Sequence, residues 1–231
     1  MAAAPISAET FLGAVPLFRE LSPLQRHRIA ESTRQVRAAR GEVLFRRGES
    51  CTGMHLIVHG QIKLSLVSPG GVEKVVEFLG AGQSFGEAVM FLDVPHVVSA
   101  QALTDALLLW IPKEVVYEHI EHDPGFARRM LAGLSRRLHQ LVADVESSST
   151  RSGTERVIGF LLRDCAVSDD GQARAADIVL PVAKGVIASR LNLTQEHFSR
   201  ILHDLSAAGL IEVKGRHIRV ADPGKLRDHA P

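Results

Sequence analysis

The stretch "LPVAKGVIASRLNLTQEHFSRILHDL", residues 180–205, contains two short helical patterns that meet at Leu191-Asn192-Leu193. Ala188 is small where two helices must cross closely, and Asn192 tolerates the left-handed conformation of a tight turn. Thr194 is a good N-cap for the second helix. The apolar face of that helix follows at helical spacing as Phe198, Ile201, Leu202 and Leu205. The pattern predicts a helix-turn-helix, in which the N-terminal part of the second helix enters the major groove of DNA.

Polar residues of the second helix lie largely off this apolar face and are candidates for reading bases. Arg200 can bond guanine bidentately, and Glu196 can accept a hydrogen bond from a cytosine amino group. The two can also form an i,i+4 ion pair worth roughly a few tenths of a kcal/mol, which would orient the arginine. The stretch "IEVKGRHIRV", residues 211–220, predicts a winged hairpin that also brings Arg219 near phosphates. We expect DNA contacts from Lys184, Thr194, Gln195, Glu196, Ser199, Arg200, Lys214 and Arg216.

The charge of the chain adds little independent support for nucleic-acid binding. The net charge is +1, and residues 150–231 carry 12 Lys and Arg against 10 Asp and Glu, a net charge of +2. Any basic surface must therefore be local. A winged helix-turn-helix can also serve as a protein-interaction module, which stays open as an alternative.

Residues 124–148 carry a different pattern, with apolar residues spaced alternately by four and three positions. This is the a/d seam of a coiled coil, and Pro124 suits the first turn of the helix. Because the stripe is narrow and flanked by charges such as Arg128 and Arg136, we expect a helix that pairs with its twin in a homodimer. The alternative is a helix packed on its own domain. The predicted seam consists of Ala127, Leu131, Leu134, Leu138, Leu141 and Val145.

Residues 36–115 read as short strands punctuated by glycines. The sequence "SPGG", residues 68–71, separates two alternating segments as a hairpin turn would. Short strands at this spacing predict a compact antiparallel barrel or roll. Further along, the Ser-rich stretch "ESSSTRSGT", residues 146–154, is the expected hinge, and the amphipathic helix "ERVIGFLLRDCA" follows it.

Bulk composition narrows the function classes. The 231 residues are 45% hydrophobic and 23% charged, and neither a signal sequence nor a membrane-spanning stretch is present, so we expect a soluble, cytoplasmic protein. The two cysteines, Cys51 and Cys165, are too few for an iron–sulfur cluster. No catalytic triad, carboxylate pair, phosphate loop or metal-ligand spacing stands out, which argues against an enzyme.

The strands, the motif "FGEAVMF" at residues 85–91, the long helix and the winged helix-turn-helix follow in this order across about residues 15–228. They resemble the cyclic-AMP receptor protein/fumarate-nitrate reductase regulator superfamily of bacterial transcription factors. The resemblance implies an α+β fold with effector-controlled binding of a homodimer to palindromic double-stranded DNA. We also expect RNA polymerase as a partner and no membrane association. The implied domains are a β-roll sensor of cyclic-nucleotide-binding type with N-terminal helices over 1–123, a dimerisation helix over 124–148 and a DNA-binding domain over 149–231.

The recognition helix bears on the subgroup within this superfamily. Glu196, Ser199 and Arg200 match the Glu-x-x-Ser-Arg motif of the fumarate-nitrate branch, which reads TTGAT-type half-sites. Cyclic-AMP receptors carry an arginine immediately before the glutamate, where this chain has Gln195. The resemblance therefore favours the fumarate-nitrate type of operator.

The stretch "FGEAVMFLDVPHVVSAQ", residues 85–101, resembles half of a cyclic-nucleotide site. Sensors of that kind hold the ribose with the glutamate of a Gly-Glu pair and the phosphate with an arginine further on. Glu87 is present, but Val98 precedes Ser99 where the arginine is expected. Burying a phosphate without a cation is costly, so cyclic AMP is disfavoured. The alternative role of Glu87 is structural, as a carboxylate that caps backbone N–H groups.

The chain most resembles the dissimilatory nitrate respiration regulator subgroup, whose members are taken to bind haem, sense nitric oxide and activate denitrification genes. Haem is thus implied by the resemblance, with the axial-ligand candidates His55, His59, His96 and His139. His55 and His59, at i and i+4 of a strand, should share one face. An apolar wall is expected from residues including Val89 and Phe91. The candidate effector pocket consists of Phe78, Phe85, Gly86, Glu87, Met90, Val98, Ser99, Leu131 and Leu134.

Several alternatives to the haem site stay open. The apolar residues can be ordinary core, and each histidine can be a surface residue. The same fold can be gated by another small ligand or by a cyclic nucleotide, or it can be a cyclic-nucleotide-binding signalling module. Cys51 or Cys165 can act as a redox-sensing thiol, although unpaired cysteines are usually buried and inert.

Overall fold

The structure, a computed structural model, describes residues 7–163 and 175–229. The chain forms two compact units that divide within one long helix, the first ending at His139 and the second beginning at Gln140. Cys165 lies outside the described residues, so the thiol hypothesis for it has no structural counterpart here.

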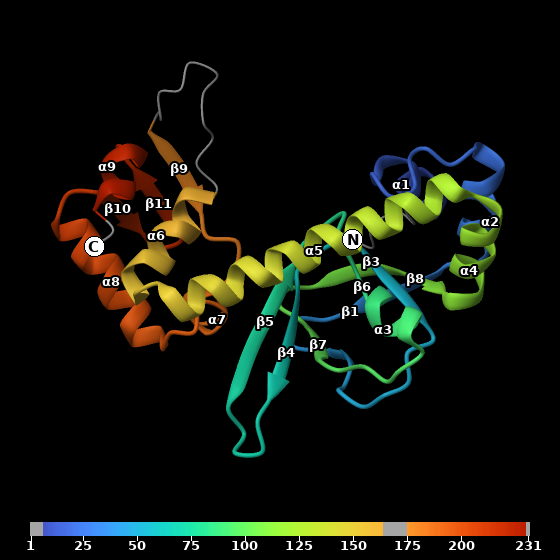
Figure 1. The fold of residues 1–231 in the computed structure, drawn as a ribbon, viewed down its shortest axis with the longest axis horizontal. Helices are drawn as coiled ribbons and strands as arrows, with labels where there is room; N and C mark the ends of the chain where they lie inside the picture. Colours follow the sequence, from blue (N-terminus) through green and yellow to red (C-terminus); the bar gives the residue numbers. More distant parts are fainter. Residues whose placement is uncertain (1–6, 164–174, 230–231) are drawn as a thin grey trace. The chain divides into compact units, whose positions relative to one another are not determined.

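The first unit is built on two four-stranded antiparallel sheets, with strand orders β1-β8-β3-β6 and β2-β7-β4-β5 (Figure 1). The antiparallel roll predicted from the glycine-punctuated strands is confirmed. The hairpin at "SPGG" is confirmed too, because the Ser68 N–H donates to the carbonyl of Val72 between β4 and β5. The strands are β1 (Arg34–Ala38), β2 (Val43–Phe45), β3 (Gly53–His59), β4 (Ile62–Val67), β5 (Glu73–Leu79), β6 (Ser84–Phe85), β7 (Ser99–Ala102) and β8 (Ala106–Pro112).

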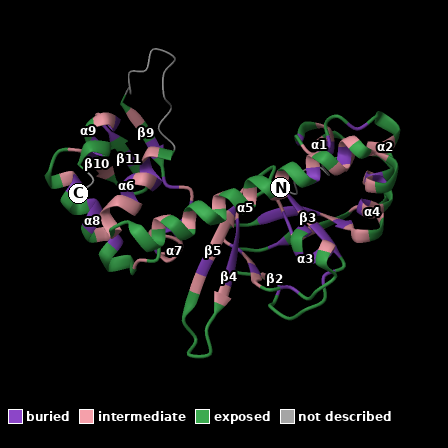
Figure 2. Ribbon diagram, in the orientation of Figure 1, coloured by how far each residue is buried: buried purple, intermediate pink, exposed green. Residues whose placement is uncertain are grey.

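The apolar residues of this unit form two cores on opposite faces of β3 and β8. Because successive strand residues face opposite sides, Leu108 joins Ile57 and Phe85 inside the roll, while Leu107 and Leu109 face a second core under the helices. This explains why the strand "ALLLWIP" is almost continuously apolar and mostly buried. Figure 2 colours the buried residues of the chain purple. The covering helices are α1 (Ala8–Ala14), α2 (Pro23–Ser32), α3 (Glu87–Leu92) and α4 (Lys113–His122), with the first turns of α5 (Pro124–Thr150).

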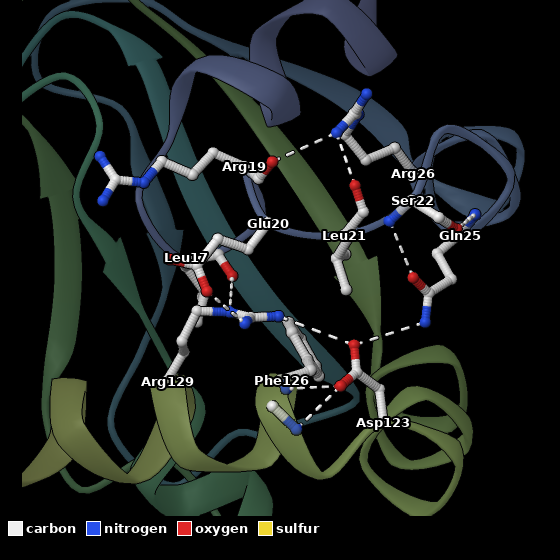
Figure 3. Close-up of polar contacts among 11 residues, drawn as sticks. Leu17, Arg19, Glu20, Leu21, Ser22, Gln25, Arg26, Asp123, Phe126 and Arg129 are labelled. Atoms are coloured by element: carbon white, nitrogen blue, oxygen red, sulfur yellow. Dashed lines mark hydrogen bonds and ion pairs between the residues drawn. The ribbon is translucent and has the colours of Figure 1, made fainter.

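Polar contacts tie the beginning of α5 to the N-terminal helices (Figure 3). The Asp123 carboxylate accepts the Phe126 N–H at 3.0 Å and so caps α5. The same side chain accepts a hydrogen bond from Gln25 on α2 and lies 3.7 Å from Arg129. Arg129 in turn pairs with Glu20 at 2.8 Å. These contacts hold the first turns of α5 against the N-terminal helices.

The Ser-rich stretch predicted as a hinge is mostly helical, because α5 continues to Thr150 and only Arg151 and Ser152 separate it from α6. The hydroxyls of Ser148 and Thr150 donate to the carbonyls of Val145 and Glu146, at 2.9 and 2.8 Å. Such bonds to the preceding turn let Ser and Thr remain in a helix. Within the described part of the chain, no helix has the length and apolar character needed to cross a membrane.

The second unit has the order predicted from the sequence, with a helix, a strand, two helices and a two-stranded wing. Its three-stranded antiparallel sheet runs β10-β11-β9 and packs with the helices. The winged helix-turn-helix is therefore confirmed. The elements are α6 (Gly153–Arg163), β9 (Ala176–Val179), α7 (Lys184–Arg190), α8 (Gln195–Ala207), β10 (Ile211–Lys214), β11 (His217–Val220) and α9 (Pro223–Asp228).

Candidate DNA-reading surface and effector site

The turn between α7 and α8 has the geometry expected from its residues. Ala188 is fully buried at the helix crossing, and Asn192 adopts the left-handed conformation with φ 58°. The Thr194 hydroxyl accepts the His197 N–H at 3.2 Å, which caps α8. The predicted apolar face is buried as well, with exposed fractions of 4% or less for Phe198, Ile201, Leu202 and Leu205. These contacts orient the opposite face of α8 toward solvent.

The exposed face of α8 carries the predicted base-reading residues. Gln195, Glu196 and Arg200 are exposed and Ser199 is half-buried. Hydrogen bonds from its own backbone N–H and from the Thr194 hydroxyl lower the pKa of Glu196, so its carboxylate lies at the N-terminus of α8. Within the described residues no ion pair joins Glu196 to Arg200. The intrahelical pair is thus not formed, because Glu196 bonds the helix end instead, and Arg200 is left available.

The wing presents basic residues beside a tight turn at Gly215, where φ is 64°. Lys214 is exposed at the end of β10. Arg216 has a structural role that the sequence did not predict. Its Nε donates to the carbonyl of Leu180 at 2.9 Å, and its Nη2 donates to that of Pro181 at 2.6 Å. Those bonds hold the wing against the segment before α7. Lys184, at the first position of α7, is half-buried.

In the sensor unit, Gly86 is the turn that leads from β6 into α3. Its φ of 98° favours glycine, and a Cβ there would lie 3.2 Å from the carbonyl oxygen of Gly53. Glu87 follows at the start of α3 and is only 6% exposed. Burial raises the pKa of its carboxyl, and hydrogen bonds from Ser84 and from its own N–H oppose that rise. The Glu87 carboxylate therefore accepts one backbone N–H, its own, which is part of the capping role considered for it.

A cation that the sequence reasoning missed lies beside Glu87. Arg137 of α5 donates from Nε to Glu77 at 2.9 Å and from Nη1 to the carbonyl of Ser84 at 3.3 Å. The same Nη1 lies 3.8 Å from Glu87 Oε2, an oxygen with no hydrogen-bond partner among the described residues. The inference from Val98 that this region lacks a cation is therefore wrong. The sequence gives no local signal for this contact, because Arg137 is one of several charged residues beside the apolar stripe of residues 124–148.

The proposed apolar wall is divided between two cores. Phe85 and Val98 belong to the core inside the roll, whereas Val89, Met90 and Phe91 pack in the core under the helices. The cause is α3, which turns the chain after Gly86 and directs its apolar side chains away from the roll interior. Of the other pocket candidates, Phe78, Ser99 and Leu134 are half-buried and Leu131 is 63% exposed.

Two of the four histidine candidates are brought together. The ring of His55 stacks on Phe85 with centroids 5.0 Å apart, and the ring of His96 stacks on Phe45 at 3.6 Å. Burial and the nearby His96 lower the pKa of His55 to about 4, and burial also lowers that of His96. Both imidazoles are therefore neutral at pH 7, and His55 Nδ1 has no hydrogen-bond partner in the part of the chain that the structure describes.

The other two histidine candidates are exposed. His59 does not share a face with His55, because the pairing of β3 with β8 shifts between Ile57 and His59. The bulge inserts one residue and reverses the side to which the following side chain points. His139 lies on the exposed side of α5. The donor type at His55 and His96 fits haem iron, while the space around the two rings is filled by the phenylalanines.

Cys51 does not have the environment of a reactive thiol. It is buried, its Sγ donates to the carbonyl of Gly53 at 3.4 Å, and burial raises its pKa. A reactive cysteine needs a lowered pKa and solvent access. The redox hypothesis is therefore disfavoured for Cys51.

Each of the two units matches a known domain family. Residues 35–123 match the cyclic nucleotide-binding domain family, and residues 155–229 match the Crp-like helix-turn-helix domain family. The chain is 21% identical over 222 residues to the CRP-like cAMP-activated global transcriptional regulator of Mycobacterium tuberculosis, covering 96% of this chain and 99% of that protein.

Two solved structures extend the comparison. FixK2 from Bradyrhizobium japonicum has the same fold, with a TM-score of 0.74 at 22% identity, covering 86% of this chain and 98% of FixK2. DNR from Pseudomonas aeruginosa is 32% identical, covering 95% of this chain and 96% of DNR, with a TM-score of 0.51. These matches and the two domains show that the chain belongs to the cyclic-AMP receptor protein/fumarate-nitrate regulator (Crp/Fnr) family, as an effector-regulated, DNA-binding transcription regulator and not an enzyme.

Proposed function

We propose that this protein is a haem-dependent nitric oxide sensor that binds TTGAT-type palindromes as a homodimer and activates denitrification genes by contacting RNA polymerase. The observation that carries the DNA-binding part is the solvent-facing side of the capped helix α8, where Glu196 and Arg200 are exposed and Ser199 is half-buried. The sensing part is supported by the two neutral imidazoles inside the roll, of which His96 is buried and His55 half-buried, and by the subgroup resemblance.

On DNA, the free guanidinium of Arg200 would bond a guanine of the half-site bidentately. Glu196, held at the start of α8, would accept from a cytosine amino group of the same site. Lys214 on the wing and Lys184 at the start of α7 would bind phosphates, which fixes the register without reading sequence. Arg216 supports the wing through Leu180, so its contribution to phosphate binding is indirect.

Competition binding with matched oligonucleotides tests the DNA assignment. Arg200→Ala is expected to cost about 1–3 kcal/mol on a TTGAT-type site and to flatten preference at the guanine. Lys214→Ala is the contrast, because it should weaken all sequences alike and reduce the salt slope by about 1. Unchanged base preference for Arg200→Ala would show that α8 does not read the site.

The dimer seam is proposed on the apolar stripe of α5. Leu131, Leu138 and Val145 are 63–65% exposed, although they are apolar and lie at a/d positions. Regulators of this family function as dimers, and such a stripe is the surface that a second copy would bury. Two half-sites lie about 34–36 Å apart, one DNA turn, so a small rotation of the paired helices changes DNA affinity. An effector acts if it binds one of the two arrangements more tightly.

Haem would be held by His55 or His96 in the roll, where it supplies an iron centre that binds nitric oxide. Both imidazoles are neutral, as iron ligation requires. Because each ring is stacked on a phenylalanine, occupation of the site requires the aromatic cluster of Phe45, His55, Phe85 and His96 to open. Opening of this cluster within the roll is the structural change that we connect to the DNA response.

Reconstitution of the full chain with haem tests the effector. One haem per protomer is expected, with a spectrum that shifts on nitric oxide addition. His55→Ala or His96→Ala should alter that spectrum, whereas the exposed His59→Ala and His139→Ala should not. Failure to bind haem stoichiometrically would refute this effector.

Arg137 supports a second candidate, a small anionic effector that includes cyclic nucleotides. Its guanidinium lies between Glu77 and Glu87, so an incoming phosphate must displace two carboxylates that already balance it. That competition argues for weak binding. Calorimetry with cyclic AMP and cyclic GMP decides, because tight binding of either would favour this candidate over haem.

A further inference from the structure

A cavity of about 160 Å³ lies within the second unit, apart from the base-reading face of α8. It is lined by the last turns of α5, by α6 and by α7. Four arginines and two acidic residues contribute to its wall, so its lining carries a net positive charge. The charged lining residues are Arg151, Arg156, Arg163, Arg190, Asp144 and Glu146.

Two of these arginines are already paired with one carboxylate. Asp144 receives Arg190 at 2.7 Å and Arg163 at 4.0 Å, and it also accepts from Gln140 at 2.8 Å. The Arg190 side chain is only 13% exposed, so this contact is a fixed part of the wall. Asp144 is therefore already paired with two of the four arginines.

The other two arginines have no acidic partner within 4 Å among the residues that the structure describes. Arg156 uses Nη1 to donate to the carbonyl of Ser148 at 3.2 Å, while its buried Nε has no hydrogen-bond partner. A buried donor that lacks a partner is costly, and a guanidinium fork matches the oxygens of phosphate. Arg151 is exposed at the cavity edge, where its charge also helps to lower the pKa of the Glu155 carboxyl.

We propose that this cavity binds a small phosphate dianion, either inorganic phosphate or a small phosphate monoester. Its volume of about 160 Å³ favours a small ligand. Sites for drug-sized ligands are usually about 300–1,000 Å³, so the cavity is small for a nucleotide. A bound dianion would link Arg151 and Arg156 across the junction of α5 with the helix-turn-helix. It would therefore stabilise the second unit independently of the sensor effector.

Calorimetry of the full chain with inorganic phosphate at constant ionic strength tests the proposal. Saturable binding of one phosphate per protomer is expected, with affinity about tenfold lower in Arg151→Ala and in Arg156→Lys. Arg37→Ala, which removes an exposed arginine on β1, is the control and should bind as the wild type does. Thermal unfolding should shift upward with phosphate concentration in the wild type and the control.

Other results of these measurements would overturn the proposal or identify the ligand. Absence of saturable binding, or equal binding by all three variants, would overturn the proposal. If Arg156→Lys fails to fold, the exposed Arg151→Ala alone decides. Glycerol 3-phosphate that binds more tightly than phosphate would identify a monoester as the ligand. Acetate that binds as tightly as phosphate, or displacement of phosphate by a short DNA duplex, would overturn the assignment to a free phosphate dianion.

Discussion

At the residue scale, single side chains of the sensor unit illustrate how burial changes ordinary chemistry. His55, Glu87 and Cys51 are all common residues with shifted pKa values, and in each case the largest cause is removal from water. Desolvation disfavours the charged form, so His55 stays neutral while Glu87 and Cys51 hold their protons more strongly. These shifts make the stability of the unit depend on pH.

His55 is expected to produce an acid-sensitive step in stability. Its folded pKa of about 4 lies below the unfolded value of 6.5, so the unfolded state binds more protons between these values. The contribution of neutral His55 to stability is fully present above about pH 6.5. The free energy of unfolding then falls by up to about 3 kcal/mol as the pH approaches 4. Denaturant unfolding of His55→Phe should lose this pH dependence, while His59→Phe, at an exposed position, should retain it. Identical pH profiles for both variants would contradict this assignment.

Gly60 is expected to be irreplaceable for a local steric reason. Its φ is 93°, and a Cβ would meet the Ala106 Cβ and the Asp105 carbonyl oxygen at 2.6 Å. Strain of about 1–3 kcal/mol for the left-handed backbone adds to overpacking of similar size, so Gly60→Ala should cost about 3 kcal/mol or more. Gly71, with φ 80° and open space around it, is the matched control and should cost only the backbone strain. Denaturant unfolding that gave equal losses would refute the steric contribution.

At the element scale, helix termini are determined by local caps that the sequence displays. Ser22 and Gln25 form a capping box on α2, Asp123 caps α5, and Thr194 caps α8. The distribution of strand residues between two cores is different, since the bulge in β3 depends on pairing with β8. The ends of helices are therefore set by nearby residues in the sequence. The side to which a strand residue points depends instead on the strand that pairs with it.

Removing the cap of α8 should destabilise the DNA-binding unit by about 1 kcal/mol. Thr194→Ala deletes the oxygen that accepts the His197 N–H, and it also removes the hydroxyl that donates to Glu196. Thr194→Ser keeps that oxygen and should unfold close to the wild type in denaturant. A loss of equal size in both variants would show that the methyl group, rather than the cap, is responsible.

At the scale of the whole molecule, the exposed apolar stripe on α5 marks the surface that we assign to a second copy. Leu138→Glu places a charge at the centre of that stripe, where the side chain is 64% exposed in one chain. Sedimentation should then show monomers, and binding to a palindrome should fall while a single half-site is unaffected. Leu24→Glu on α2, an equally exposed leucine at 62%, should remain dimeric. A dimeric Leu138→Glu protein would place the seam elsewhere.

The sequence by itself determined the features that rest on neighbours within one or two turns. The helix-turn-helix, its cap at Thr194, the left-handed Asn192 and the heptad stripe of α5 all follow from local spacing. The hairpin at "SPGG" and the antiparallel roll are also local enough to be predicted from turns and alternation. The subgroup resemblance and the haem hypothesis came from sequence too, and they stay predictions.

Only the tertiary structure decided which side chains meet across long separations. Arg137 reaches Glu77 across 60 positions, Arg216 reaches Leu180 across 36, and the bulge after Ile57 separates the faces of His55 and His59. The arginine-lined cavity likewise joins α5, α6 and α7. Such contacts depend on how whole elements pack, because desolvation and shape complementarity act between residues that no sequence period connects.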